Sequence, residues 1–310
     1  MKVLILVNLD ANHKKAKKKW ELIAGDILRL MPGTTEIIKF TIPFDIKTCI
    51  HDQIVNNGLR NIISAGGDGT ANMILNTLLH DPKIIMSELN IGFIGLGSSN
   101  DLLKPVTRSI KDIPLKIDVN NVTPVDLGLA LFMDENQKLN KKLFLGNSSI
   151  GVGASANWLF NKEDFIIHNL KSRWTNLTIL YTTIKSIFNF KNYRLCMKYK
   201  GLEKERVISY LAVLKTRHIS GKMRFDQKIL SNDGRMGLNF CENMNKQELI
   251  MVMKDLHKGV FSGRKKRHSC FVKELFIKSK VLIPVEFDGE IEMAKEVSYS
   301  ILPKAINRMQ

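Results

Sequence analysis

The stretch NIISAGGDGTANMILNTLL, residues 61–79, is the most informative part of the N-terminal half of the chain. A run of small apolar residues is followed by two glycines, an aspartate and a third glycine, and then by the apolar spacing of an amphipathic helix over residues 71–79. A strand that runs directly into a helix indicates a βα unit, whose connection needs only a turn and a helix cap. The segment has more glycines than a turn and a helix cap require, so the glycines indicate a further role for this loop.

Apolar strands and helices alternate on both sides of this stretch. Strands are expected at residues 2–7, 36–41, 61–65 and 91–96, and helices at residues 46–57, at residues 71–79 and in an Ala/Lys/Leu-rich segment that ends near Leu30. Continuous apolar strands separated by helices are typical of a parallel sheet covered on both faces. We therefore predict an α/β domain over residues 1–128, with ligands at the carboxyl ends of its strands.

The pattern changes after PVDLG, residues 124–128. Strand-like segments follow at hairpin-like intervals, at residues 142–150, 192–200, 206–214, 235–240 and 274–287, with two helical stretches inserted. This pattern predicts a second domain over residues 129–310, a mostly antiparallel β-sandwich, whose last segment can return to the first domain.

Composition argues against several classes of protein. The 310 residues are 44% hydrophobic, which suits two domains with full cores. Four cysteines lie far apart without a C-x-x-C pair, so neither a disulfide framework nor a zinc site is expected, and a reducing, cytoplasmic compartment fits best. No apolar run approaches the roughly 20 residues of a membrane span, and the start MKVLILVNLD is too short for a signal-peptide core. We expect neither a secreted nor an integral membrane protein.

The charge is unusual, because 47 Lys and Arg against 30 Asp and Glu give a net charge of +17. Such a field favours polyanions, whether nucleic acid, an anionic membrane surface or phosphate-bearing ligands. The densest clusters, at residues 13–20 and 263–268, contain few of the aromatic residues on which bases stack. For each cluster alone, a solvated face remains the alternative interpretation.

The glycine-rich turn has the chemistry of a phosphate site. Glycine lets the backbone approach a ligand closely and reach positive φ, and the N–H groups at a helix start attract anions. Asp68 would repel phosphate unless a hard cation lay between them. Mg²⁺ resolves this conflict because it binds through one or two carboxylates together with substrate phosphates. A tight βα turn in which Asp68 caps the helix is the alternative.

A second glycine-rich loop, GLGSSND at residues 95–101, follows the next strand and adds hydroxyls and N–H groups to face the same phosphates.

Two other phosphate-binding motifs were considered, and neither is supported by the sequence. The chain has no G-x-x-x-x-G-K-[ST] sequence, and GVGASA at residues 151–156 lies in the β-rich half without an acidic residue about 20 positions on. Neither a P-loop nor a dinucleotide-binding fingerprint is therefore predicted.

The motifs AGGDGT, IGFIGLGSSNDL, PVDLG, SNDGRMGL and FDGE, in this order and spacing, resemble the diacylglycerol kinase catalytic-domain family. This family includes bacterial soluble lipid kinases and the sphingosine and ceramide kinases, and the likeness covers nearly the whole chain. The resemblance implies a lipid kinase that uses ATP and Mg²⁺ to phosphorylate a lipid hydroxyl, such as that of diacylglycerol. It implies a lipid substrate reached at an anionic membrane surface and no nucleic-acid partner.

The resemblance also implies site residues. Glu290 matches the general base, although Asp288-Gly289 by itself is a strong two-residue hairpin signal with an exposed glutamate after it. Asp68, Asp101 and Asp126 match an active-site Mg²⁺ and water network. The positions expected to contact the nucleotide in the α/β domain are Asn8, Thr41, Gly66, Gly67, Gly69, Thr70, Gly97, Ser98 and Ser99.

A structural Mg²⁺ site is implied in the β-rich domain. In bacterial members the residue that matches Asp233 binds this ion together with backbone carbonyls, which here would be those of Leu230 and Arg235. Asn232 stands where many members have a second acid. The first loop also departs from the family pattern N-P-x-S-G, since Leu9, Ala11 and Asn12 replace the proline, serine and glycine.

Two alternatives remain open. The G-G-D-G-T motif is shared with NAD kinases, which act on a soluble metabolite, and the altered loops leave room for a non-catalytic lipid- or nucleic-acid-binding protein. The apolar stretch at residues 176–190 is expected either to line a lipid entrance or to be buried in the core. The oligomeric state is open, a homodimer included.

Overall fold

The computed structural model describes residues 2–31, 33–161, 181 and 184–310. The chain divides into two compact units, which we call unit 1 (Met1–Val125 and Pro303–Gln310) and unit 2 (Asp126–Leu302). The last eight residues belong to unit 1 because the end of the final strand pairs with a strand of that unit.

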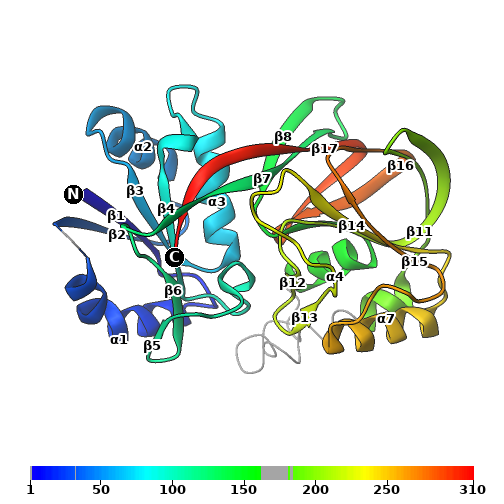
Figure 1. Ribbon diagram of the computed structural model, residues 1–310, viewed down its shortest axis with the longest axis horizontal. Coiled ribbons are helices and arrows are strands. Elements are labelled where there is room, and N and C mark those ends of the chain that lie inside the picture. The colour runs from blue at the N-terminus through cyan, green and yellow to red at the C-terminus, as the bar shows by residue number, and fades with distance from the viewer. Residues whose placement is uncertain (1, 32, 162–180, 182–183) are drawn as a thin grey trace. The chain divides into compact units, whose positions relative to one another are not determined.

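Unit 1 is built on a parallel sheet, as predicted (Figure 1). Its strands β1 (Lys2–Asn8), β2 (Thr34–Phe40), β3 (Asn61–Gly66) and β4 (Asn90–Gly95) lie in the order β2-β1-β3-β4. The outer edge of β4 pairs with the end of β17 (Glu290–Met309) and with β6 (Ile113–Lys116), which in turn pairs with the short strand β5 (Ser109–Ile110).

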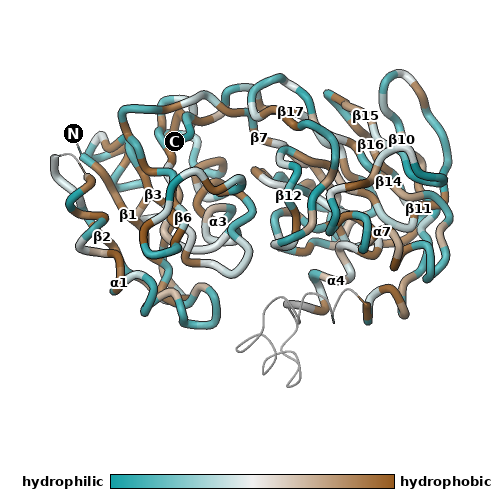
Figure 2. Tube along the Cα trace, turned by 60° about the horizontal axis from the view of Figure 1, so that its bottom comes forward, coloured by the Kyte–Doolittle hydropathy of each residue, from teal (hydrophilic) through white to brown (hydrophobic). Residues whose placement is uncertain are grey.

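The α-helices of unit 1 are α1 (Lys15–Leu30), α2 (Ile46–His51), which continues as a π-helical turn to Asn56, and α3 (Asp68–Leu79), and short 3₁₀ helices lie at Met86–Glu88 and Asp101–Leu103. Helix α1 buries Ala16, Trp20, Ile23 and Ile27, the spacing of one helical face, against alternate residues of β1. Strand β1 is hydrophobic from Val3 to Val7 (Figure 2), because both of its faces are covered there.

Unit 2 is mostly antiparallel, as predicted. Its central strands lie in the order β15-β14-β11-β10-β16-β17, β9 pairs with both β11 and β16, and β7 pairs with β8 and β17. The strand bounds are β7 (Val122–Met133, beginning in unit 1), β8 (Leu139–Phe144), β9 (Asn147–Gly151), β10 (Tyr193–Tyr199), β11 (Leu202–Leu214), β12 (His218–Ile219), β13 (Met223–Arg224), β14 (Met236–Glu242), β15 (Arg267–Val272) and β16 (Leu275–Phe287).

Two cores stabilise unit 2. One is rich in aromatic rings, with Phe132, Phe144, Phe287 and Tyr299 in contact between strands. The other is formed with the helices α4 (Val152–Asn161) and α7 (Lys246–Lys258). The helix α7 begins with a capping box between Asn245 and Glu248 and ends at Gly259 in the left-handed conformation.

The described residues contain no helix that is both long enough and apolar enough to cross a membrane. Part of the apolar stretch predicted at residues 176–190 lies outside the described residues, at 176–180 and 182–183. Within its described part, Ile187 is buried in the core beneath α7.

The predicted hairpin at Asp288-Gly289 is confirmed. Strand β16 ends at Phe287 and β17 begins opposite it at Glu290, and the two turn residues have φ values of 49° and 98°, as a type I′ turn requires. The Asp288 side chain is buried, and its carboxylate accepts backbone N–H bonds from residues 145, 146 and 147 at 2.7, 2.9 and 2.8 Å. The turn is thus tied to the segment between β8 and β9.

Replacing Asp288 by alanine should lower the free energy of unfolding by at least about 3 kcal/mol, because three buried N–H groups would lose their acceptor at about 1–3 kcal/mol each. Urea denaturation measures the loss. Asp288→Asn keeps one acceptor oxygen, so its free energy of unfolding should lie between those of the wild type and the alanine variant. A loss below about 1 kcal/mol for the alanine variant would contradict this account.

Candidate active site

The two glycine-rich loops of unit 1 pack against each other. The carbonyl oxygen of Gly66 accepts the N–H groups of Leu96 and Gly97 at 2.8 and 3.0 Å. A Cβ atom on Gly97 would lie 2.5 Å from the Cα atom of Gly67, and one on Gly66 would overlap the Thr70 side chain. Gly67 and Gly97 are therefore required by the close approach of the two loops, and Gly66 by its contact with Thr70 in the first turn of α3.

The helix that follows the first loop begins earlier than predicted. Helix α3 starts at Asp68, with Gly67 in extended conformation as its N-cap, whereas the apolar pattern marked its start at residue 71. Gly69 and Thr70 therefore lie in the first turn of α3. The positive φ values expected for this loop are not found, since none of its glycines has φ in the left-handed region.

Gly69 differs from the other glycines of the loop. A Cβ atom built on Gly69 would meet no atom within 4 Å, so packing within the protein does not explain the missing side chain. Gly69 lies in the first turn of α3, a helix of twelve residues, where the N–H of Thr70 bonds back to the carbonyl oxygen of the N-cap Gly67 and the N–H groups before it have no i−4 partner in the helix. Open space beside a helix N-terminus is suited to an anionic group.

Asp68 links the two loops. Its carboxylate accepts the N–H groups of Asp101 and Leu102 at 3.0 and 3.2 Å. The Asp101 carboxylate in turn contacts the Nζ atom of Lys104 at 2.6 Å. The structure thus brings Asp68 and Asp101 together at the junction of the two loops.

Asn8 and Thr70 lie side by side beneath the loop. The Asn8 amide donates to the Thr70 hydroxyl at 3.0 Å, and both side chains are buried. The Asn8 amide oxygen also accepts the N–H of Asp10, which orders the loop after β1. Thr41 is exposed, directly after the end of β2.

Lys19 was not singled out from the sequence. Its Nζ atom donates to the carbonyl oxygens of Gly97 and Leu96 at 3.0 and 3.4 Å, so a cation lies on the second loop. Burial and the charge of Lys15 lower the pKa of Lys19. In the sequence Lys19 was one of several lysines on a helix, and only the contact to the loop distinguishes it.

The α/β part of the predicted site is therefore assembled from β1, β3, α3 and the loop after β4. Of the second-loop serines, Ser98 is exposed and Ser99 is half-buried. The predicted residues that share this region through packing or hydrogen bonds are Asn8, Gly66, Gly67, Asp68, Thr70, Gly97 and Asp101.

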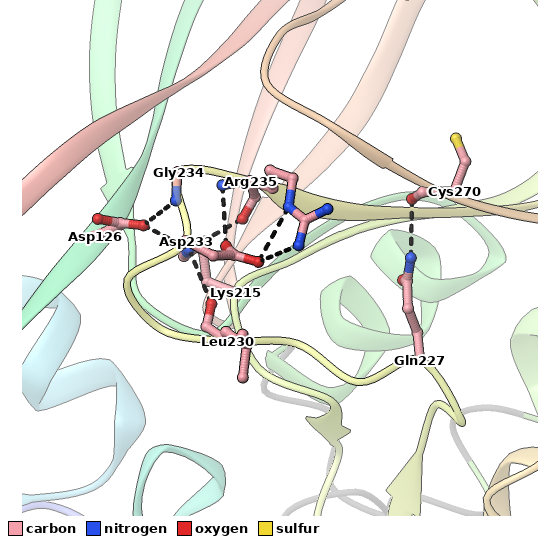
Figure 3. A network of polar contacts seen from close by, with 8 residues as sticks. All are labelled: Asp126, Lys215, Gln227, Leu230, Asp233, Gly234, Arg235 and Cys270. Carbon is pink, nitrogen blue, oxygen red and sulfur yellow. Dashed lines mark hydrogen bonds and ion pairs between the residues drawn. The ribbon is translucent and has the colours of Figure 1, made fainter.

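Asp126 belongs to a different cluster, within unit 2 (Figure 3). Its carboxylate accepts the N–H of Gly234 at 2.8 Å and lies 3.4 Å from the Nζ atom of Lys215. The side chains of Asp126 and Lys215 are each 1% exposed. Burial lowers the pKa of Lys215, while the Asp126 charge opposes this change.

The residues expected to hold a structural metal lie in the same cluster. The Lys215 Nζ atom donates to the carbonyl oxygens of Arg235 and Leu230 at 3.0 and 3.4 Å. Asp233 accepts three bonds from Arg235, from its N–H, Nε and Nη2 groups. The described residues contain no group of three or more His, Cys, Asp or Glu side chains arranged for a metal ion.

Glu290 begins β17, and its side chain is 46% exposed. The Nζ atom of Lys142 lies 2.7 Å from the Glu290 carboxylate and 2.8 Å from that of Glu292. Burial acts to lower the pKa of Lys142, but bonds to both glutamates outweigh it, so the pKa is raised. Lys142 therefore positions Glu290, and local sequence pattern could not predict this contact because the two residues lie 148 positions apart.

Two protein-family models match the chain. Residues 2–130 match the diacylglycerol kinase catalytic domain, and residues 146–310 match the YegS C-terminal NAD kinase β-sandwich-like domain. These two parts define a two-domain kinase fold related to that of the NAD kinases. The chain belongs to the diacylglycerol kinase catalytic-domain family. Curated proteins gave no match.

Solved structures share the fold. Three structures from Bacillus anthracis str. Sterne, described as diacylglycerol kinases, two of them provisionally, are 18%, 17% and 16% identical with TM-scores of 0.73, 0.74 and 0.68. Each alignment covers 99% of this chain and 96% of the other. Yeast NADH kinase in complex with NADH is 9% identical over 99% of this chain and 82% of its own, with a TM-score of 0.50.

The raised pKa of Lys142 predicts a pH-dependent stability. Because the pKa is higher in the folded than in the unfolded protein, the contribution is complete below about pH 10.5 and is lost as pH rises through the folded value. The wild type should exceed Lys142→Met in unfolding free energy at pH 8, and the difference should shrink above about pH 10.5. Urea titrations at several pH values measure it.

The exposed neighbour Lys141 provides the matched control. Lys141→Met should show a smaller difference from the wild type than Lys142→Met at pH 8. A difference for Lys142→Met that grows with pH would refute the assignment.

Proposed function

We propose that the protein is an ATP-dependent lipid kinase that transfers the γ-phosphate to a lipid hydroxyl such as that of diacylglycerol. The proposal rests on membership of a kinase family together with one observation, the open space beside Gly69 at the start of α3. The other glycines of the two loops are accounted for by packing, and Gly69 is left for a ligand.

ATP would bind with its phosphates at the N-terminus of α3, where N–H groups and the helix dipole favour negative charge. The hydroxyls of Ser98 and Ser99 and the side chain of Thr41 are further proposed contacts from neighbouring strand ends. Lys19 holds the second loop and adds positive charge to it.

Mg²⁺ would be held by Asp68, with Asp101 beside it, and would neutralise the phosphate charge. Both oxygens of Asp68 are oriented by backbone N–H bonds, so its carboxylate is fixed in position before any ligand binds. Asp101 is also paired, with Lys104, but it lies next to Asp68, whereas Asp126 is buried with Lys215 and Gly234 and is left out of this proposed network.

Glu290 is the proposed general base. As the lipid oxygen attacks the γ-phosphorus, its proton would pass to the Glu290 carboxylate and ADP would leave. The side chain is accessible, and Lys142 fixes its direction. Phosphoryl transfer otherwise depends on positioning and charge neutralisation, which the loops of unit 1 would supply.

The lipid would be reached at an anionic membrane surface, with the protein in the cytoplasm and peripheral to the membrane. Each basic residue close to an anionic leaflet contributes about 1 kcal/mol, and the net charge of +17 supplies many. All four cysteines are free thiols, which suits a reducing compartment. No nucleic-acid partner is proposed.

Activity with labelled ATP tests the substrate class. Purified protein should phosphorylate a lipid in vesicles that contain diacylglycerol and an anionic phospholipid. NAD and other soluble acceptors should remain unlabelled. Labelling of NAD instead would support the soluble-metabolite alternative, and binding of vesicles without any transfer would support the non-catalytic one.

In the same assay Glu290→Gln should lower kcat at least about 100-fold, while the rise in melting temperature on adding ATP and Mg²⁺ persists. Glu292→Gln is the matched control because Glu292 also contacts Lys142. It should keep kcat within a few-fold of the wild type. Substantial turnover by Glu290→Gln would remove Glu290 as the base.

Gly69 allows a test in which stability and binding change in opposite directions. Gly69→Ala should raise the free energy of unfolding by up to about 1 kcal/mol, since alanine favours the helix and meets no neighbour. It should also weaken the ATP-dependent rise in melting temperature, because the methyl group enters the open space. Gly97→Ala should instead lower stability, because its Cβ atom meets Gly67. Unchanged ATP binding by Gly69→Ala would contradict the proposed phosphate position.

A further inference from the structure

The turn before β14 is held by a lysine whose three donors are all used. Lys215 directly follows the buried apolar end of β11, and its ammonium group contacts Asp126, Leu230 and Arg235 at 3.4, 3.4 and 3.0 Å. A lysine ammonium has three N–H donors, and here they face one carboxylate oxygen and two backbone carbonyl oxygens. Figure 3 shows the side chain between β7 and this turn.

Two of these acceptors are the carbonyl groups through which a structural divalent cation would be bound in this family. The oxygens of Leu230 and Arg235 are directed at the Lys215 nitrogen at hydrogen-bond distances. A Mg²⁺ ion needs oxygens at about 2.0–2.1 Å in octahedral geometry, and a Ca²⁺ ion needs six to eight oxygens at about 2.3–2.6 Å. The ammonium therefore occupies the space that such an ion would need.

The remaining expected ligand is also engaged. Asp233 accepts the Nε and Nη2 groups of Arg235 at 3.2 and 3.0 Å, and the same guanidinium lies 4.7 Å from the centre of the Phe271 ring. The acid expected at a neighbouring position is replaced by Asn232. Two carboxylates are thus matched by two side-chain cations, and an added divalent ion would lie against the ammonium.

We propose that Lys215 replaces the structural divalent cation of this family, so that the turn at residues 230–235 is held to β7 by a covalently attached ammonium group and binds no metal ion. A bound ion is lost when its free concentration falls, but a side chain is not. The fold of unit 2 is therefore independent of divalent cations, whatever the nucleotide site of unit 1 requires.

The test measures the melting temperature without nucleotide, in EDTA and in Mg²⁺, for the wild type, Asp233→Asn, Lys215→Ala and the double variant. An ion that binds at Asp68 should raise the melting temperature of all four proteins by the same amount. Binding at the turn is therefore measured as the Mg²⁺-dependent rise that is lost when Asp233 is replaced by asparagine. The wild type should show no Mg²⁺-dependent rise in melting temperature that depends on Asp233. Lys215→Ala should gain a rise of about 5 °C at Mg²⁺ about 100-fold above its dissociation constant, and the double variant should lose it.

Lys266→Ala is the matched control, because Lys266 also donates to a backbone carbonyl, that of Asn243, and to a carboxylate, that of Glu248, but lies nearer the surface. It should gain no shift with Mg²⁺. An EDTA-sensitive shift in the wild type that Asp233→Asn abolishes would overturn the proposal, as would a folded Lys215→Ala that gains none. If Lys215→Ala does not fold, the comparison of wild type with Asp233→Asn decides alone.

Discussion

The candidate active site depends on the backbone contact between Gly67 and Gly97. This contact lets two loops from neighbouring strands share the hydrogen bonds of Gly66, and it places Asp68 where it accepts two N–H groups from the second loop. A Cβ atom on Gly97 would lie 2.5 Å from the Cα atom of Gly67 and would push the two loops apart. The preorganisation that phosphoryl transfer requires is thus supplied by the absence of three side chains.

In unit 2 the buried carboxylates are satisfied from within the chain. Asp288 is surrounded by backbone N–H groups, and Asp126 by one N–H and an ammonium. Each joins segments far apart in the sequence, and neither could be buried without its partners, since an unpaired buried charge costs several kcal/mol. The turn that presents Glu290 is therefore held to the segment between β8 and β9 by three hydrogen bonds.

Much of the fold could be predicted from local pattern. The parallel strands, the antiparallel second unit and the Asp288-Gly289 turn follow from periodicity and turn chemistry, which act over a few residues. The start of α3 was misplaced because glycine is a poor helix former and only the packed loops favour Asp68 as its first residue. The contacts of Lys142 and Lys215 could not be predicted, because the partners of each lysine lie on segments far away in the sequence.

Electrostatic repulsion explains why the Lys215 ammonium group and a divalent cation would exclude each other. At an effective dielectric constant of about 20, two unit charges about 4 Å apart interact by about 4 kcal/mol, so a divalent cation beside the ammonium would be repelled by about twice that. The carbonyl cage can therefore hold one cation or the other, but not both. An ammonium pays its desolvation penalty once, on folding, and three acceptors offset that penalty. A side chain in this position makes the integrity of the turn a property of the sequence alone, while any metal dependence of the protein is confined to the chemistry of the glycine-rich loops.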